Sequence, residues 1–405
     1  MLGITMRIAI VGAGLMGRAA ALDLADDLVS PNVESVLVAD IDGDRAGRVA
    51  EEAKSLTTYK EVRHAKLDAT RLDEVISALR EFKADVVIDA ALYTTIPVVM
   101  RAALEAKVHY LDLGDDVETL LAQKEMDHQF KSEGLVALLE MGGSPGLINV
   151  MAAKAVRELD RIETLLLREG WIDLNDYDSM GVPLPVPYSL DTIFDELEQP
   201  VEVWKDGRIE LVEPFSGREV MTFPPPVGEQ ELYYVEHPEV YSLGETFRGK
   251  GLRFVDYKLS FPRDLLLKYK LLHDLGLTST RPVRLGGVSV IPRDIVRELI
   301  LDSLKGKAFK PNDHDVMRVI ARGWRGGVRA EVLVEALISW SERWNVSAQA
   351  LLVGSPASLA AQWIGLGILS LPGVHYPEEV IDPGPFLDEM KRRGMEFRER
   401  VLLNI

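Results

Sequence analysis

A glycine-rich turn close to the start of the sequence most constrains the fold of this chain. Residues 11–17 read VGAGLMG, a G-x-G-x-x-G pattern between an apolar run typical of a buried strand and a run typical of a helix. In such a unit the first glycine permits a tight turn, the second lets the backbone approach a pyrophosphate, and the third lets helix and strand pack closely. The helix N-terminus then presents amide groups and a positive dipole end to phosphate. The residues expected to contact a dinucleotide here are Gly12, Gly14, Leu15, Met16 and Gly17.

A carboxylate follows this turn at the spacing of a nicotinamide dinucleotide site. The next apolar strand, VLVAD, ends in Asp40, 23 residues after the last glycine, where an acid accepts hydrogen bonds from the ribose hydroxyls of NAD. Asp40, Asp42 and Asp44 would repel a 2′-phosphate, so the sequence favours NAD over NADP. Arg45 and Arg48 oppose this interpretation, because a basic residue just beyond the strand can hold that phosphate.

The first part of the chain alternates strand-like and helix-like patterns. From Arg7 to about Glu158, short apolar runs such as IAIV and VVI are separated by helical stretches. Uninterrupted apolar strands are buried on both faces, which indicates a parallel sheet covered by helices on each side. The fold class is therefore α/β, with a doubly wound Rossmann sheet. The expected strands are Arg7–Val11, Ser35–Ala39, Val62–Leu67, Asp85–Asp89, Val108–Leu111 and Leu135–Leu139.

The pattern changes after about Arg161. Longer, more polar runs alternate with period two, and residues 205–207 and 324–327 are typical of hairpin turns, so a second α+β domain on a mixed or antiparallel sheet is expected. Helices are predicted near Asp264–Leu275 and Pro292–Lys305. We expect an NAD-binding domain over residues 1–150, a substrate and dimerisation domain over 151–350, and a helical return to the first domain over 351–405.

One stretch raises the possibility of a membrane span. Residues 350–374 are mostly apolar and uncharged, but glycine and proline divide them. We therefore expect a short strand at Leu351–Val353 and a buried helix from Ser355 to about Ile368, and no membrane partner.

Composition excludes several classes of protein. The chain has 64 acidic and 46 basic residues, a formal charge of −18, so its long-range field repels phosphates and no nucleic-acid partner is expected. It has no cysteine, which excludes disulfides, thiolate metal sites and cysteine nucleophiles. No H-x-x-x-H spacing is present, and no metal site is expected. With no targeting pattern in residues 1–17, a cytoplasmic location is expected.

Several sequence blocks together resemble a known family. The chain is similar to the saccharopine dehydrogenase family, and within it to the lysine 6-dehydrogenase type, nearly from end to end. The resemblance implies a Rossmann domain, a substrate domain inserted before a C-terminal return, and usually a homodimer. It implies hydride transfer between a nicotinamide and the carbon that bears an amino-acid nitrogen. The blocks are VGAGLMG (11–17), YLDLGDD (110–116), GGSPGLINV (142–150), YSLDTIFDE (188–196), KYKLLHDLGL (268–277), VSVIPRDIV (288–296), SPASLAAQWIG (355–365) and YPEEVIDPGPFLDEMKRRG (376–394).

The carboxyl ends of the parallel strands should form the ligand crevice of the first domain. Small side chains at Ala90, Ala91 and Gly143 would let the backbone approach the ribose and the nicotinamide ring, with ordinary loop geometry as the alternative. Asp68 ends the third strand and is either a contact on the adenine side or the cap of the next helix. Tyr93 either orients the substrate or packs under the adjacent helix.

Amine oxidation requires a group that accepts a proton from the nitrogen. Asp115 and Asp116 follow a strand where a cationic amine would meet a carboxylate, and the alternative is that they cap the helix that starts at Val117. Among the seven histidines we select His237, because it follows the apolar strand ELYYV and relatives of the lysine type carry a histidine at a similar place. A structural role is the alternative for His237.

An amino-acid substrate also needs a partner for its carboxylate, and a guanidinium fits best. Relatives often carry an Arg-Tyr-x-Gly element before the KLL helix, whereas this chain keeps only the positive charge of Arg263 there. Arg263 is therefore the leading candidate, ahead of Arg248 and Arg253, and a surface role is the alternative. Tyr188, which follows a proline-rich loop, is expected to help form the pocket wall.

These observations favour an NAD-dependent enzyme that oxidises the C–N bond of lysine or of a lysine-derived amino acid. Two alternatives stay open. One is the reverse chemistry, reductive condensation of an amine with a keto acid or semialdehyde, as in the formation of saccharopine or carboxynorspermidine. The other is a protein that senses NAD without turnover.

Overall fold

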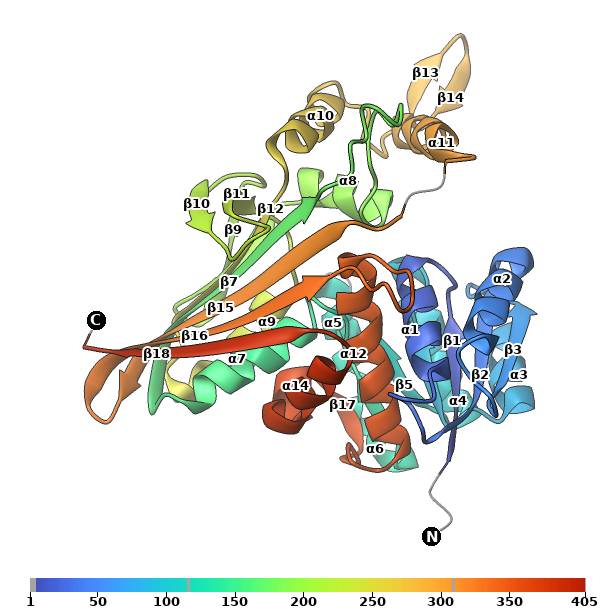
Figure 1. Cartoon of the computed structure of the whole chain (residues 1–405), viewed down its shortest axis with the longest axis horizontal. Coiled ribbons are helices and arrows are strands. Elements are labelled where there is room, and N and C mark those ends of the chain that lie inside the picture. The colour runs from blue at the N-terminus through green and yellow to red at the C-terminus, as the bar shows by residue number, and fades with distance from the viewer. Residues whose placement is uncertain (1–4, 115–116, 308–309, 405) are drawn as a thin grey trace.

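The first domain is built on a parallel sheet. The computed structural model describes residues 5–114, 117–307 and 310–404 (Figure 1). The strands of this sheet are β1 (Met6–Val11), β2 (Val33–Asp40), β3 (Glu61–Lys66), β4 (Val86–Asp89), β5 (His109–Asp112), β6 (Val136–Leu138) and β17 (Gly373–His375). Their order is β17-β6-β5-β4-β1-β2-β3, and every adjacent pair is parallel. The order reverses between β1 and β4, which places a ligand crevice at the carboxyl ends of these strands. The doubly wound α/β prediction is confirmed.

Helices cover both faces of this sheet, because alternate residues of each strand point to opposite sides. Ile8 and Ile10 of β1 are buried in one hydrophobic cluster, and Ala9 and Val11 are buried in another. Strands buried on both faces need apolar residues at successive positions, which explains runs such as IAIV. The connecting helices are α1 (Leu15–Ala25), α2 (Gly43–Lys54), α3 (Leu72–Phe82), the 3-10 turn η1 (Tyr93–Thr95), α4 (Ile96–Ala106), α5 (Val117–Lys124), α6 (Asp127–Glu133) and α7 (Leu147–Arg157).

A nine-stranded sheet forms the second domain. Its strands are β7 (Arg161–Asp173), β8 (Val201–Lys205), β9 (Arg208–Val212), β10 (Glu219–Thr222), β11 (Glu229–Tyr234), β12 (Phe254–Ser260), β15 (Asp313–Arg325), β16 (Val328–Ser339) and β18 (Glu396–Leu403). The main order is β10-β11-β12-β7-β15-β16-β18, and β8 pairs with β12 and β9. Among the strands that the structure describes here, only β12 and β7 run parallel, so the sheet is mixed. Its helices are α8 (Leu190–Glu198), α9 (Glu239–Phe247), η2 (Arg248–Lys250), α10 (Arg263–Asp274) and α11 (Pro292–Leu304).

The apolar stretch after residue 347 is one continuous helix, α12 (Ala348–Gly365), which packs against α1. The expected strand at Leu351–Val353 and the expected helix start at Ser355 are therefore wrong. The helix begins earlier because Ser347 caps it, its hydroxyl accepting a hydrogen bond from the amide of Ala350 at 3.1 Å. Within the described ranges, no helix is long and apolar enough to cross a membrane.

The end of the chain contributes strands to both domains, which the sequence did not predict. After α12 come β17, α13 (Pro377–Val380), α14 (Pro383–Arg392) and β18. β17 pairs with β6 of the first sheet, and β18 pairs with β16 of the second. In β18, Phe397 and Val401 lie on one face of the strand and pack on the core.

A buried ion pair connects the end of α14 to α1. The guanidinium Nε of Arg393 lies 2.8 Å from Oδ2 of Asp23, and neither side chain is exposed. The hydroxyls of Ser358, on α12, and of Ser30 also donate to Oδ1 of Asp23, at 2.6 and 3.2 Å. The charge of Asp23 is thus satisfied by three separate segments of the chain.

Candidate active site

The glycine corner between β1 and α1 has the shape that a dinucleotide requires. Gly12 has a φ of 104°, and a Cβ there would lie 2.3 Å from the carbonyl oxygen of Ala90. A Cβ at Gly17 would lie 1.9 Å from the carbonyl oxygen of Gly12, so neither position accepts a side chain. At Gly14, no described atom lies within 4 Å of such a Cβ, which leaves open space at the N-terminus of α1. These residues fit a pyrophosphate held at the first-turn amides of α1.

Asp40 lies beside the glycine corner, at the end of β2. It is buried, its Oδ2 accepts a hydrogen bond from the amide of Ala13 at 2.7 Å, and its Oδ1 lies 2.7 Å from Arg45. Burial acts to raise its pKa, but hydrogen bonds from Arg45, Ala13 and Asp42 outweigh burial and lower it. A lowered pKa keeps Asp40 ionised, which suits an acceptor for ribose hydroxyls.

Asp68 follows β3 and forms a local turn. Its Oδ1 accepts hydrogen bonds from the amide and the hydroxyl of Thr70 at 3.0 and 2.7 Å, and the Thr70 hydroxyl is the largest cause of its lowered pKa. The residue before α3 is Arg71, so Asp68 is not the cap of that helix.

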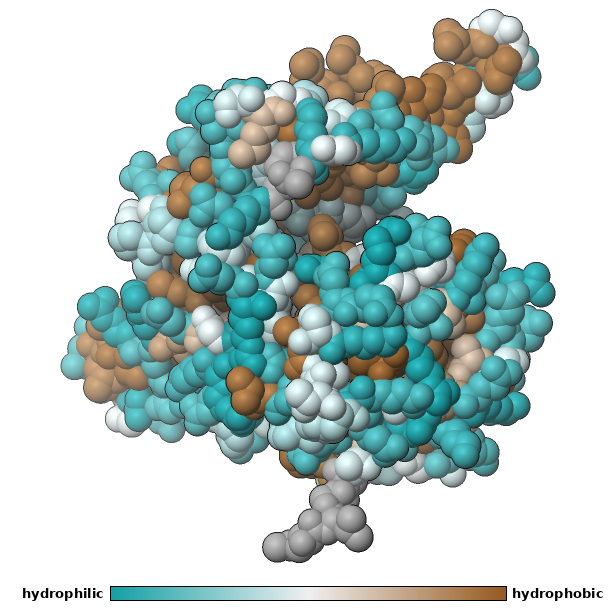
Figure 2. All heavy atoms as spheres, turned by 45° about the vertical axis from the view of Figure 1, so that its right-hand side comes forward, coloured by the Kyte–Doolittle hydropathy of each residue, from teal (hydrophilic) through white to brown (hydrophobic). Residues whose placement is uncertain are grey.

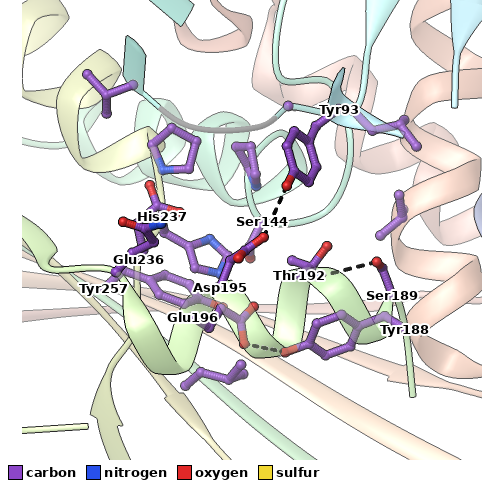
Figure 3. A pocket seen from close by; sticks show the side chains of 18 of the residues that line it. Tyr93, Ser144, Tyr188, Ser189, Thr192, Asp195, Glu196, Glu236, His237 and Tyr257 are labelled. Carbon is purple, nitrogen blue, oxygen red and sulfur yellow. Dashed lines mark hydrogen bonds between the residues drawn. The ribbon is translucent and has the colours of Figure 1, made fainter. Parts of the chain in front are cut away.

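A cleft of about 580 Å³ lies where the carboxyl ends of the first sheet face the second domain. Loops after β4, β5 and β6 form one wall, strands and helices of the second domain form the other, and residues of α12 close one side. Figure 3 shows this cleft, with Tyr93 reaching in from the first domain toward side chains from the second. The residues singled out from the sequence that line it are Met16, Ala91, Tyr93, Tyr188 and His237.

The other residues singled out from the sequence lie around the cleft or away from it. Ala90 backs the glycine corner, and Gly143 packs so closely on Leu352 that a Cβ would lie 1.8 Å from its Cδ1. Leu15 is exposed at the start of α1. Arg263 is the exposed first residue of α10 and is not among the described residues that line the cleft. Asp115 and Asp116 lie outside the described residues.

His237 is held on two sides. Its imidazole stacks on the ring of Tyr257 with centroids 3.7 Å apart, and its Nδ1 lies 3.2 Å from Oε2 of Glu239. Burial disfavours the charged imidazole, but the carboxylates of Glu239, Glu196 and Glu236 overcome this and raise its pKa to about 9. Because Glu239 occupies Nδ1, the other ring nitrogen is left to exchange a proton with a ligand in the cleft.

Glu169 joins two hydroxyls next to His237. Its Oε2 accepts hydrogen bonds from Ser144 at 2.7 Å and from Tyr257 at 2.9 Å. Behind it, Gln349 donates to Asp315 at 2.6 Å, and burial followed by the charge of Glu169 raises the pKa of Asp315 well above its usual range. Both hydroxyls are therefore fixed in direction, which suits groups that orient a substrate.

A second group of side chains links the domains across the cleft. The hydroxyl of Tyr93 lies 3.2 Å from Oδ2 of Asp195, and Oδ1 of Asp195 lies 2.6 Å from Arg293. On the same helix, Glu196 accepts a hydrogen bond from the hydroxyl of Tyr188 at 2.6 Å. Tyr93 thus bridges η1 and α8, which sets the width of the cleft at this point.

Several residues of this cleft were not identified from the sequence, among them Glu169, Glu196 and Tyr257. For one of these residues, the sequence itself indicates a buried charge. Glu169 and its neighbour Arg168 are the two charged residues within the run LLLREGW of β7, and a charge at a buried strand position needs a partner. Glu196 and Tyr257 have no comparable signal, because they reach the cleft only when distant segments of the second domain, α8 and β12, come together.

The fold and the cleft define a class of protein, a nicotinamide-dependent dehydrogenase with a Rossmann domain and a separate substrate domain. Residues 8–138 match the saccharopine dehydrogenase NADP binding domain, and residues 142–395 match the saccharopine dehydrogenase C-terminal domain. The chain therefore belongs to the saccharopine dehydrogenase family, and it is an NAD(P)-dependent amino-acid dehydrogenase. The resemblance to the saccharopine dehydrogenase family stated from the sequence is confirmed.

Individual relatives are distant. Carboxyaminopropylagmatine dehydrogenase of Synechocystis sp. is 26% identical over 410 residues, which cover 98% of each chain. Carboxynorspermidine synthase of Vibrio cholerae is 26% identical over 353 residues, covering 83% of this chain and 82% of that one. The structure of apo saccharopine dehydrogenase (L-Glu forming) from Saccharomyces cerevisiae superposes with a TM-score of 0.69 at 17% identity, covering 98% of this chain and 100% of that one, and it supports the fold.

Proposed function

We propose that this protein uses NAD to oxidise the C–N bond of lysine or of a lysine-derived amino acid. The observation that carries the proposal is the placement of His237, which shares one cleft with the carboxyl ends of the strands that hold the glycine corner. When bound, the nicotinamide accepts a hydride from the carbon next to the nitrogen. His237 would take the proton that leaves the nitrogen, and the hydroxyls of Ser144 and Tyr257 would orient the substrate. Water then hydrolyses the resulting C=N bond, or the product cyclises.

NAD is proposed over NADP because of Asp40. Its ionised carboxylate suits two ribose hydroxyls and opposes a 2′-phosphate. Arg45 is already paired with Asp40 at 2.7 Å, so it would have to leave this carboxylate to bind a phosphate. A lower KM for NADP than for NAD would contradict the assignment.

The pH dependence follows from His237. With a pKa of about 9, its imidazole is charged at neutral pH and cannot accept a proton. We expect kcat/KM for amine oxidation to rise about tenfold per pH unit below about 9 and to level off above it, because kcat/KM reports the free enzyme. The reverse reaction, which needs the protonated form, should lose rate above that pH. Steady-state rates in both directions measure this, and an oxidative profile that is flat from about pH 7 to about pH 10 would contradict it.

A second candidate is reductive condensation of an amine with a keto acid or semialdehyde. Two observations favour it. His237 is protonated at neutral pH and so is ready to donate a proton in the reductive direction. One relative, the Vibrio enzyme, is named a carboxynorspermidine synthase.

A substrate panel tests both candidates. The intact protein is incubated with NAD or NADP and a set of diamino acids and opines, and with NADH or NADPH and pairs of amines and carbonyl acids, while absorbance of the reduced nicotinamide is followed. Reduction of NAD by lysine supports the first candidate, and oxidation of NADH only when an amine and a carbonyl acid are both present supports the second. Tight cofactor binding without turnover in either arm would contradict both.

We also propose a homodimer that forms through the arm, defined here as residues 263–304. The arm carries α10 and α11 joined by the β13 (Val283–Leu285) and β14 (Val288–Val290) hairpin, and it projects from the rest of the molecule (Figure 1). Figure 2 shows hydrophobic surface over its tip. Exposed apolar surface of this kind is typical of a protein–protein interface. In a two-fold symmetric dimer, the same patch of each copy forms the contact. The exposed apolar side chains are Leu267, Leu271, Leu275, Val283, Leu285, Val288, Ile295, Leu299 and Leu301.

Replacing Leu271 by glutamate should shift the protein from dimer to monomer, because charge in a desolvated interface is costly. Light scattering during size-exclusion chromatography gives the mass. Leu371→Glu, at an equally exposed leucine outside the arm (60% against 59%), is the matched control and should leave the mass unchanged. A wild-type protein that elutes as a monomer at micromolar concentration would contradict the proposal.

A further inference from the structure

Three buried glutamates lie next to His237 but are not among the described residues that line the cleft. They are Glu140, Glu239 and Glu378, called here the glutamate cluster. Glu140 follows β6, Glu239 begins α9, and Glu378 lies in α13, in the region where α7, α9 and α13 pack on one another. Among the described residues, the cluster has a single ion pair, between His237 and Glu239. Like charges buried without cations repel one another, so at least one of these carboxyls carries a proton.

Glu140 is the member of the cluster with the fewest hydrogen bonds. Neither of its carboxyl oxygens has a hydrogen-bond partner in the described part of the chain, and Oε1 of Glu239 has none there either. Burial, followed by the charges of Glu378, Glu239 and Asp112, raises the pKa of Glu140 well above its usual range. Glu140 also has a φ of 55°, which residues other than glycine rarely adopt. Unfavourable features that coincide at one buried residue are typical of a functional group.

The cluster continues from Glu140 toward the surface. The hydroxyl of Ser242 acts to lower the pKa of both Glu140 and Glu378, so it faces both carboxyls. Asn149 donates to the hydroxyl of Ser242 at 3.1 Å and to Oε2 of Glu378 at 2.9 Å. Oε1 of Glu378 lies 3.4 Å from the hydroxyl of Thr246, a partly exposed residue. Burial raises the pKa of Glu378 to about 7, so near neutral pH this carboxyl both takes up and releases protons.

A cation site is the alternative interpretation of such a cluster. The described residues contain no group of three or more histidines and carboxylates that could hold a metal ion, so the cluster does not have the geometry of a metal site. The ammonium of Lys124 lies 3.5 Å from Glu379 and 4.0 Å from the ring centroid of Tyr376, outside the cluster. The other titratable groups around the cluster are Asp112 of β5, Lys124 of α5, Tyr241 of α9, and Tyr376 and Glu379 at α13.

We propose, resting on the role in proton transfer given above to His237, that the glutamate cluster is a proton path between this histidine and solvent. The path begins at Nδ1 of the imidazole and ends at the hydroxyl of Thr246. During the reaction, substrate and nicotinamide cover the cleft side of His237 and exclude water there. A proton taken up at Nε2 therefore needs a second way out, and the cluster provides it.

Each step of the path moves one proton. When a proton from the substrate nitrogen binds Nε2, the proton on Nδ1 moves to Oε2 of Glu239, 3.2 Å away. Glu239 then passes a proton on to Glu140. The hydroxyl of Ser242 carries it to Glu378, and the hydroxyl of Thr246 releases it to water. Every step breaks one N–H or O–H bond and forms another, so no further reactant is consumed. In the reductive direction the protons move the opposite way.

Hydrogen exchange of the Nδ1 proton of His237 tests the path without turnover. The full chain is prepared with isotope-labelled histidine and loaded with NADH, and NMR measures how fast this proton exchanges with water. The signal is assigned by its absence from His237→Asn. Glu140→Gln and Glu378→Gln each place a neutral side chain of the same shape in the path, but an amide does not pass the proton on. We expect each variant to slow the exchange at least about tenfold, because only local opening of the structure then remains.

The direction of the change separates a proton path from a structural role, because a substitution that loosens the packing would speed up exchange of a buried proton. Glu245→Gln, at an exposed glutamate of α9 outside the cluster, is the matched control and should exchange as wild type. Unchanged or faster exchange in either Glu140→Gln or Glu378→Gln would overturn the inference, even if the substrate panel shows turnover. Slower exchange in both, with no turnover in the panel, would overturn the proposed function and leave the proton path standing.

Discussion

Replacing His237 by asparagine is expected to lower kcat/KM by about 10²–10⁴-fold, the range for loss of a positioned acid–base group. The asparagine retains a polar side chain of similar size but cannot exchange a proton. Most of the loss should appear in kcat, because His237 acts on the proton that moves during reaction rather than on ground-state binding. Steady-state kinetics measures this in whichever direction the substrate panel identifies.

The pH profile separates this role from a merely structural one. In the wild-type protein the change of kcat/KM with pH near 9 reflects the titration of His237, so this change should be absent from the variant. A variant that is only misfolded would keep the same pH dependence at a lower rate. His128→Asn, at an exposed histidine of α6, is the control and should retain full activity. A loss smaller than about tenfold, with this pH dependence intact, would contradict proton transfer by His237.

Replacing Asp23 by alanine is expected to lower the free energy of unfolding by about 3–5 kcal/mol, the cost of leaving a buried charge without its partner. The Arg393 side chain is fully buried, and Asp23 is its closest carboxylate at 2.8 Å, so the variant leaves this guanidinium with only the more exposed Glu389, at 3.3 Å. The hydroxyls of Ser358 and Ser30 lose their acceptor as well. Urea unfolding followed by circular dichroism measures the difference.

An exposed ion pair provides the matched control. Arg157 and Asp382 lie 2.6 Å apart, but their side chains are 56% and 62% exposed, so Asp382→Ala should cost no more than about 1 kcal/mol. Replacing the buried pair together, with Asp23→Leu and Arg393→Met, should recover much of the loss, because no unpaired charge remains. Equal effects of Asp23→Ala and Asp382→Ala would contradict the assignment of Asp23 as a buried anchor.

The first domain could be predicted from the sequence because its signals are local. The glycine turn, the acid at Asp40 and the apolar runs each constrain their own neighbours, and parallel strands buried on both faces leave a continuous apolar pattern. The alternation of strand and helix predicts the parallel, doubly wound sheet that β1 to β6 form, but not the order of its strands. β17 lacks such a signal because it has only three residues and joins the sheet 235 positions after β6 ends.

The candidate site was predictable only in part. His237 and Tyr188 stand out because they follow an apolar strand and a proline-rich loop, respectively. The preference for Arg263 rested on the need to hold a substrate carboxylate, whereas the structure places that side chain in solvent. Glu196 is one of many acidic residues in the sequence, and only its burial beside Tyr188 distinguishes it. Burial of a charged side chain is a tertiary property, which local pattern does not encode.

The way the chain ends limits how this protein can be recombined. Because β17 completes one sheet and β18 completes the other, no single cut divides the molecule into two self-sufficient halves. A chimera with a substrate domain from another protein would need two junctions, one before β7 and one after β16. The edge strand of the new domain would also have to pair with β18. Shuffling by simple end-to-end fusion would leave each half with an unpaired sheet edge, which invites aggregation.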